Sequence, residues 1–237
     1  PLIWERLGLT LLISVLALVA AWAIALPIGI YSAVRQYGVV DYVASALAMV
    51  GMATPPFLLA LVLLFFANRY LGVTLGGLFS EEYINAPWSV GKVLDLLKHL
   101  WLPVGVLAVS AAGGLMRTLR ANLLDQLQMP YVDTARSKGL PELRVVLKYP
   151  VRIAINPLIS SIGWMLPQMI SATIIVDVVL GLPTTGPLML NGLKAQDMYL
   201  GGALVMMLSV LTMLGTLVSD VLLAWVDPRI RFEGGRR

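Results

Sequence analysis

The side chains that most often carry out catalysis are scarce in this chain. Cysteine is absent and His99 is the one histidine, so neither a thiol nucleophile nor a cluster of imidazole metal ligands can form. The phosphate-binding pattern G-x-x-x-x-G-K-(S/T) does not occur, because Gly91-Lys92 lacks the upstream glycine and the following hydroxyl residue. The patterns G-x-S-x-G and H-E-x-x-H are absent as well. The sequence therefore predicts no catalytic site, no metal site and no bound cofactor.

Two carboxylates lie within or beside long apolar runs, where acidic groups can carry protons or ions. Asp177 and Asp220 both lie near an end of such a run, so hydrogen bonding or capping is the favoured interpretation for each. Asp177 is also a candidate gate residue. Met165, Gln168 and Ser171 precede it in the same run and are pore candidates, with helix packing as the alternative use.

The most polar stretch of the chain, Tyr131–Leu140 (YVDTARSKGL), is flanked by a proline on each side. Ten residues make a helix of about 15 Å, and Gly139 stands where a helix C-cap is expected. Tyr131 and Ala135 are four residues apart and Val132 adjoins them, which predicts an apolar face. This pattern has two interpretations: a charged connecting loop, or a short helix that docks on a soluble partner.

The elements that position these residues are predicted to be membrane-spanning helices. Hydrophobic residues make up 59% of the 237 residues and charged residues only 13%, against about 25% in soluble domains. This composition predicts an all-α, polytopic helical membrane protein. The uncharged runs that are long enough to cross about 30 Å of hydrocarbon are Leu7–Val34, Tyr42–Asn68, Leu100–Met116, Ile153–Val176 and Met198–Ser219.

The distribution of basic residues predicts the orientation of these five spans. Of the 17 lysines and arginines, twelve fall on the side that holds the C-terminus and five on the other side. The C-terminus is therefore expected in the cytoplasm and residue 1 outside. The inner segment 117–152 is expected to be a small helical coupling segment. In the outer segment 69–99, the spacing of Val93, Leu94, Leu97 and Trp101 predicts an amphipathic helix on the outer surface.

The chain is interpreted as one transmembrane domain over residues 1–237. It begins at Pro1 and enters an apolar run almost at once. Five spans leave the two ends on opposite sides of the membrane, and one additional helix before residue 1 would place both ends in the cytoplasm. We therefore expect that the chain is cut from a longer subunit and that an N-terminal helix is missing.

Four stretches resemble the permease subunits of ATP-binding-cassette (ABC) importers, in the branch that carries dipeptides, oligopeptides and nickel. Tyr131–Leu140 is similar to the cytoplasmic signature Y-V-x-T-A-R-(A/S)-K-G-L of that branch. Leu97–Pro103 (LKHLWLP) resembles the beginning of its third span, and Gly181–Pro187 (GLPTTGP) resembles its loop after the fourth. Asp220–Arg231 (DVLLAWVDPRIR) is similar to its C-terminal end. The resemblance keeps the same order along nearly the whole chain.

The resemblance implies a type I importer fold and a set of partners. These are a second permease subunit, two ATP-binding subunits that hold the ATP, an extracytoplasmic substrate-binding protein and the lipid of a bacterial or archaeal cytoplasmic (inner) membrane. Nucleic acid is not among them. In the family the signature is a coupling helix that contacts the ATPase. The contacts implied here are Tyr131, Val132, Thr134, Ala135, Arg136, Lys138, Gly139 and Leu140.

Two other function classes remain as alternatives at this point. A self-sufficient secondary transporter or channel would move its solute without ATP or partners, but such proteins place acids nearer the midplane than this chain does. A membrane enzyme would need a catalytic group that the sequence lacks. The resemblance leaves the cargo open among peptides, nickel, glutathione and oligosaccharides.

Overall fold

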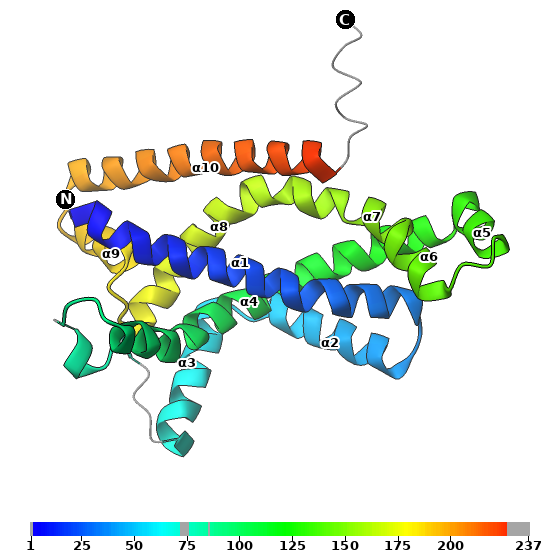
Figure 1. The fold of residues 1–237 in the computed structure, drawn as a ribbon. Helices are drawn as coiled ribbons and strands as arrows, with labels where there is room; N and C mark the ends of the chain where they lie inside the picture. Colours follow the sequence, from blue (N-terminus) through cyan, green and yellow to red (C-terminus); the bar gives the residue numbers. More distant parts are fainter. Residues whose placement is uncertain (1, 72–75, 85, 227–237) are drawn as a thin grey trace, which may run out of the picture.

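A computed structural model describes residues 2–71, 76–84 and 86–226, and over these residues the chain is helical without a strand (Figure 1). The long helices lie side by side along the molecule, and two short irregular helices precede α4. The elements in chain order are α1 (Leu2–Val34), α2 (Val39–Ala53), α3 (Pro56–Phe66), a π-helix (Ala67–Leu71), a 3-10 helix (Glu81–Tyr83), α4 (Val90–Leu127), α5 (Pro130–Ser137), α6 (Glu142–Lys148), α7 (Pro150–Ala154), α8 (Asn156–Leu180), α9 (Thr185–Lys194) and α10 (Met198–Val226).

The predicted spans correspond to the longest helices. Among the described residues, α1, α4, α8 and α10 are each long and apolar enough to cross a membrane, and the bent pair α2–α3 gives a fifth crossing if it counts as one span. Pro27 lies inside α1 and does not end it, because the helix continues to Val34. The all-α membrane architecture predicted from composition is confirmed. The C-terminal motif at 227–231 lies outside the described residues.

The second predicted span, Tyr42–Asn68, is not one straight helix. It is broken between α2 and α3, whose axes differ in direction by 103°. Thr54 has extended backbone angles (φ −86°, ψ 120°) and is followed by Pro55 and Pro56. A residue before proline avoids the helical region, and a proline supplies no N–H to the preceding turn, so two prolines in succession end α2 and start α3 in a new direction.

The third predicted span, Leu100–Met116, is only the middle of α4. This helix runs for 38 residues, about 57 Å, from Val90 to Leu127. Ser89 caps its first turn by accepting a hydrogen bond from the Lys92 amide, and Pro103 lies within it. The expected separate surface helix is therefore the first part of α4, and the inner segment also begins within the same helix.

The outer part of α4 turns its polar side chains toward the preceding loop. The Asp95 carboxylate accepts hydrogen bonds from the amide and hydroxyl of Ser80, each at 2.7 Å. Lys92 donates to the Ala86 carbonyl at 2.6 Å and lies 4.9 Å from the centre of the Phe79 ring. The apolar side chains on the other face, which are exposed, are Val90, Val93, Leu94, Leu97 and Trp101.

Close backbone contacts hold α2 against α4. A Cβ atom on Gly113 would lie 2.6 Å from the carbonyl oxygen of Ala48, and one on Gly51 would lie 3.1 Å from the carbonyl oxygen of Val109. The approach at Gly113 requires glycine, and the contact at Gly51 is tight. Gly113 therefore serves helix packing, whereas a Cβ on Gly114 would meet nothing within 4 Å.

A charged pair joins the same two helices nearer to the α5 end. Arg120 of α4 donates from Nε and Nη2 to the two carboxylate oxygens of Asp41 in α2, both at 2.8 Å. Asp41 also accepts hydrogen bonds from the Ser32 hydroxyl and from the Tyr37 amide, the latter at 2.9 Å. Asp41 is only 3% exposed. Because it bonds both Tyr37 and Arg120, it connects the turn between α1 and α2 to α4.

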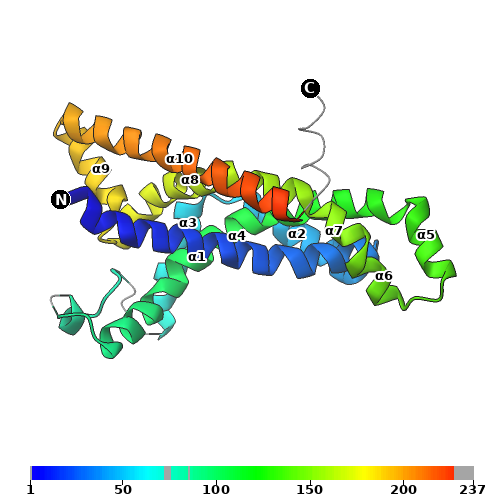
Figure 2. The ribbon, with the colours of Figure 1, turned by 45° about the horizontal axis from the view of Figure 1, so that its top comes forward.

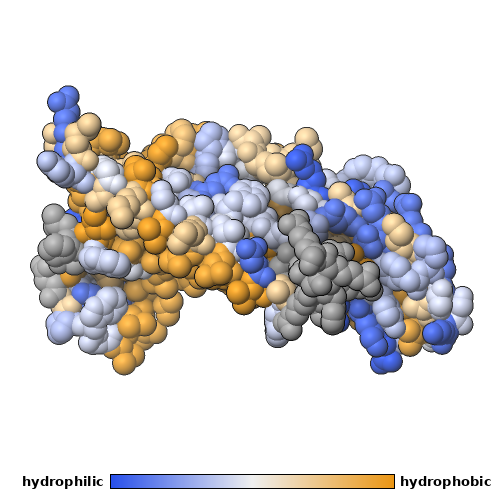
Figure 3. Space-filling view, turned by 90° about the horizontal axis from the view of Figure 1, so that it is seen from above, coloured by the Kyte–Doolittle hydropathy of each residue, from blue (hydrophilic) through white to orange (hydrophobic). Residues whose placement is uncertain are grey.

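The molecule is elongated, and its two ends differ in polarity. In Figures 1 and 2, α5 and α6 form one end, while the N-terminus and the loop before α4 lie at the other. Hydrophilic side chains gather at the α5–α6 end in Figure 3, and apolar side chains cover much of the opposite half. This arrangement places the predicted coupling segment beyond the apolar body of the helix bundle.

Candidate functional site

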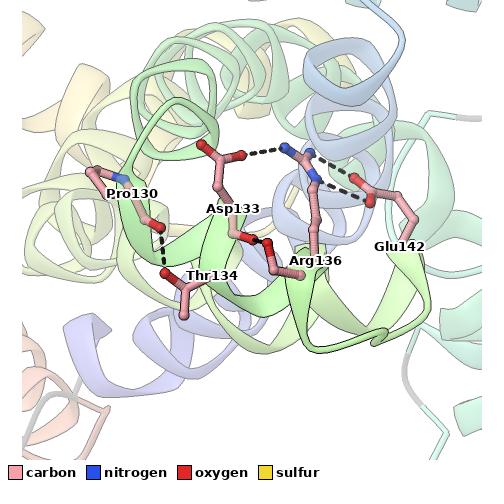
Figure 4. Close-up of polar contacts among 6 residues, drawn as sticks. Pro130, Asp133, Thr134, Arg136 and Glu142 are labelled. Atoms are coloured by element: carbon pink, nitrogen blue, oxygen red, sulfur yellow. Dashed lines mark hydrogen bonds and ion pairs between the residues drawn. The ribbon is translucent and has the colours of Figure 1, made fainter.

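The stretch Tyr131–Leu140 forms a short helix followed by a tight stop. Pro130 occupies the first turn of α5, where its missing N–H costs nothing. Gly139 has φ +74°, a left-handed conformation that ends the helix and that glycine adopts without strain. The Thr134 hydroxyl donates to the Pro130 carbonyl at 3.0 Å (Figure 4). The predicted helix and its glycine stop are therefore present, with α5 ending at Ser137.

The apolar face of α5 is turned inward, toward the rest of the chain. Val132 is 0% exposed and Ala135 is 5% exposed, and both pack with Val145 of α6. Half-buried Tyr131, Leu140 and Tyr149 surround this small core. The resemblance implies that Tyr131, Val132 and Ala135 contact a partner. The structure instead uses Val132 and Ala135 to hold α5 against α6, because the short coupling segment needs a core of its own.

Arg136 is paired within the coupling segment. It donates from Nη2 and Nε to the Glu142 carboxylate at 2.8 and 3.2 Å, and from Nη1 to Asp133 at 3.3 Å (Figure 4). These hydrogen bonds raise the pKa of Arg136 above its usual value and lower the pKa of Glu142. The guanidinium therefore fixes α5 to the first turn of α6, a use that its spacing in the sequence does not reveal.

Several exposed side chains on α5 and at its C-terminal end are polar. Thr134, Ser137 and Lys138 are exposed, and Gly139 beside them is exposed with open space around its Cα. Tyr131 donates its hydroxyl to Gln126 at 2.8 Å, and burial raises the pKa of this phenol. The surface that α5 offers to another molecule is thus small, hydroxyl-rich and positively charged at Lys138.

The segment that carries α5 is the direct link between two long helices. Gln128 and Met129 join α4 to α5, and α6 and α7 lead from there into α8 (Figure 1). Helix α7 also packs against α4. The segment that carries α5 is therefore connected to α4 at one end and to α8 at the other.

A cavity of about 580 Å³ lies between these two helices and the break between α2 and α3. Met52 and Pro56 contribute from the break. The main lining residues of α4 are Leu107, Ser110, Ala111, Gly114, Arg117 and Thr118, and those of α8 are Ser161, Trp164, Met165, Gln168 and Ala172. On each helix these positions, singly or as adjacent pairs, recur every three or four residues, so each helix presents one continuous face to the cavity.

The predicted pore residues separate into three groups. Met165 and Gln168 line the cavity. Ser171 is exposed one turn farther along α8 and does not line it. Asp177 lies at the far end of α8, buried and distant from the cavity lining.

Asp177 takes part in a buried polar contact between α8 and α9. Its Oδ2 atom accepts a hydrogen bond from the Thr184 hydroxyl at 2.6 Å, and its Oδ1 atom has no partner among the described residues. The Thr185 amide donates to the hydroxyl oxygen of Thr10 in α1 at 3.0 Å. The loop with the adjacent threonines therefore bridges three helices at the end of the molecule opposite α5.

Comparisons with known proteins are consistent with this architecture. Residues 25–232 match the family described as "Binding-protein-dependent transport system inner membrane component". The chain belongs to that family.

The relatives of this permease include the oligopeptide transport system permease protein AppB of Bacillus subtilis, which is 35% identical over 232 residues, covering 98% of this chain and 72% of AppB. OppB of Mycobacterium tuberculosis is 32% identical, covering 96% of this chain and 71% of OppB. Among solved structures, an inward-facing form of the MetNI methionine ABC transporter has a TM-score of 0.74 at 17% identity, over 95% of this chain and 96% of that one. The chain is the membrane-embedded permease subunit of an ABC importer of the inner membrane.

The residues of the permease that sequence reasoning missed are charged groups in the half of α4 nearer to α5. Arg117 and Arg120 were counted only as inside-facing charge, because the third span was expected to end at Met116. Arg117 lines the cavity, and Arg120 pairs with Asp41. The sequence did carry a usable signal: Ser110, Gly114 and Arg117 continue the same helical face past the expected end.

Proposed function

We propose that this permease forms half of a translocation path for peptides or a related small solute, and that ATP hydrolysis by partner subunits drives the path by alternating access. The relatives named above are oligopeptide permeases, and the match to them runs along nearly the whole chain. The permease itself performs no bond chemistry in this scheme. ATP binding closes the partner dimer, the movement of α5 opens the path outward, and hydrolysis resets it.

The observation that carries this proposal is that α5 belongs to the connection between the two helices that line the cavity. The short segment α5–α7 connects α4 to α8, and both helices line the 580 Å³ cavity. A push on α5 is passed on because α5 is fixed to α6 by a small core and by the Arg136–Glu142 pair. A flexible loop in the same place would absorb the push instead.

The docking surface that we propose on α5 is its exposed side. Thr134, Lys138 and Gly139 are the contacts with the ATP-binding subunit, with Arg136 and Tyr131 at the margin of the surface. Val132, Ala135 and Leu140 act indirectly, since they set the angle at which the exposed side is presented. The open space around Gly139 suits the close approach of another backbone.

The remaining partners are assigned from the exposed surfaces. A second permease subunit would cover the part of α8 beyond the cavity, where Ser171 and Ile175 are exposed one turn apart. Two ATP-binding subunits would contact the α5 ends of the two permeases, and the C-terminus would lie on that same cytoplasmic side. An extracytoplasmic binding protein would deliver the solute at the other end, where buried Asp177 is the candidate gate residue. Lipid surrounds the apolar body.

The test is reconstitution of the permease with its cognate ATP-binding and substrate-binding subunits. We expect Lys138→Glu together with Ser137→Trp to reduce both co-purification of the ATP-binding subunits and ATP-driven uptake by at least tenfold. Lys98→Glu, the same charge reversal on an exposed residue at the opposite end, is the matched control for co-purification. Full uptake and normal co-purification in the double variant would overturn the assignment of the docking surface.

The alternative of a self-sufficient secondary transporter or channel is tested in the same vesicles. Our proposal predicts no uptake when the ATP-binding subunits are left out or when ATP is replaced by a non-hydrolysable analogue. Uptake by the permease alone, driven by an ion gradient or by the solute gradient, would contradict it.

A further inference from the structure

The cavity between α4 and α8 carries one kind of charge. Arg117 is the charged residue among the described residues that line it, and no aspartate or glutamate is among them. Within the part of the chain that the structure describes, no carboxylate forms an ion pair with Arg117. The contrast with Arg120, three residues later on the same helix, is direct, because Arg120 has both its donor nitrogens bound by Asp41.

The neighbours of Arg117 in the cavity are neutral hydrogen-bonding groups and an aromatic ring. Ser110 and Thr118 of α4 supply hydroxyl groups, and Gln168 of α8 supplies an amide. Trp164 of α8 also lines the cavity, and 58% of its surface is exposed. A guanidinium, hydroxyls, an amide and an indole can together bind a carboxylate, a peptide group and an apolar side chain.

The size of the cavity suits such a ligand. Small-molecule sites usually measure about 300–1,000 Å³, and the 580 Å³ observed falls inside that range. An arginine on an apolar wall attracts an anion more strongly than one in bulk water, because the surrounding dielectric constant is lower. The planar guanidinium also matches the two oxygens of a carboxylate.

We propose that this cavity is a cargo subsite for a carboxylate-bearing, peptide-like solute, with Arg117 binding the carboxylate. Gln168 and the cavity hydroxyls bond the adjacent amide groups, and Trp164 contacts an apolar side chain. The proposal rests on the proposed function and narrows its cargo. A free metal cation is disfavoured by the charge of Arg117, and a neutral oligosaccharide makes no use of it.

The first experiment measures the charge of the cavity with thiol reagents. The chain has no cysteine, so Gly114→Cys introduces a single reporter, and its Cβ meets nothing within 4 Å. In the assembled transporter without nucleotide, we measure labelling by an anionic and by a cationic methanethiosulfonate of similar size. We expect Arg117→Gln to lower the anion-to-cation rate ratio at least tenfold. Arg144→Gln, on exposed α6 away from the cavity, is expected to leave the ratio unchanged.

The second experiment measures binding at the same reporter. Trialanine is expected to slow labelling at least threefold at millimolar concentration, whereas trialanine with a C-terminal amide is not. Arg117→Gln is expected to abolish the difference. Arg117→Lys keeps the charge and loses the planar fork, so it should retain the rate ratio of the first experiment and show weaker protection.

Two results would overturn the assignment: equal protection by the acid and the amide, or an unchanged rate ratio and protection in Arg117→Gln. If Arg117→Gln fails to assemble, the comparison of protection by trialanine and by its C-terminal amide, in the parent and in Arg117→Lys, still tests whether Arg117 binds the carboxylate. Neither measurement needs ATP turnover. Loss of ATP-driven uptake in the parent would therefore contradict the proposed function and leave this test intact.

Discussion

The pair between Asp41 and Arg120 gives the sharpest prediction about stability. Arg120 bonds both carboxylate oxygens of Asp41 at 2.8 Å, and Asp41 is 3% exposed. Arg120→Gln would leave a buried negative charge with only the Ser32 hydroxyl and the Tyr37 amide as strong partners. Breaking a buried pair from one side costs about 3–5 kcal/mol, a large part of the roughly 5–15 kcal/mol that stabilises a typical domain.

A double variant distinguishes the loss of the ion pair from the cost of leaving one charge buried without a partner. Asp41→Asn with Arg120→Gln removes both charges, so no uncompensated ion remains. We expect it to recover all but about 1–2 kcal/mol of the parent's stability, the range of a hydrogen bond or two. Arg117→Gln is the matched control, since it makes the same substitution one turn earlier on α4, at a residue that forms no ion pair with any described residue.

The assay is unfolding of the detergent-solubilised permease by increasing sodium dodecyl sulfate, followed by far-ultraviolet circular dichroism. The expected order of stability is parent, Arg117→Gln, double variant and, well below these, Arg120→Gln. If Arg120→Gln unfolds within about 1 kcal/mol of the parent, or if the double variant is as unstable as the single one, the pair does not neutralise a buried charge and the reasoning fails.

Four further outcomes are expected. Gly139→Ala should destabilise the coupling segment by about 1–2 kcal/mol through its positive φ alone, and Gly139→Asn by less; equal effects in thermal unfolding would contradict this. Thr184→Val should cost about 1–3 kcal/mol by removing the hydroxyl that Asp177 accepts, and an unchanged midpoint would argue against the buried contact. A spin label at Val90→Cys should be more accessible to oxygen than to an aqueous nickel chelate, and a label at the exposed Glu81→Cys should show the reverse. If the nickel chelate reaches both labels better than oxygen does, the exposed apolar face of α4 does not contact lipid. Because hydrogen bonds from Arg136 lower the pKa of Glu142, that pair should stabilise α5 above the ordinary carboxyl pKa of 4.5 and lose this effect as pH falls below it, which amide exchange in α5 between pH 3 and 6 would reveal.

Residue patterns over a few adjacent positions in the sequence were sufficient to predict some parts of the site. Proline before the stretch and glycine at its end predict α5 and its stop, because both act through local backbone geometry. The spacing of Tyr131, Val132 and Ala135 predicts an apolar face but does not say what that face packs against. Val132 and Ala135 would suit a groove on another protein or a core within the chain, and only the folding back of α6 decides for the core.

The break between α2 and α3 shows a similar division. Two adjacent prolines mark a position where a helix is disfavoured, so the site of the break is local information. The 103° change of direction is not, because it depends on how α3 packs against α8 and α4. The same holds for Gly113, whose value as a packing residue depends on the Ala48 carbonyl brought to it by α2.

The sequence by itself determined the class of the molecule, the number of crossings to within the bent pair, the polar helix α5 and the resemblance to importer permeases. These follow from composition and from spacings of a few residues, which act through hydropathy and backbone geometry. Only the tertiary structure decided that Arg120 is neutralised by a residue 79 positions away, that Arg117 faces a cavity, and that Asp177 meets Thr184. The pairing of a charge depends on which helices become neighbours, and that is settled by packing over the whole chain.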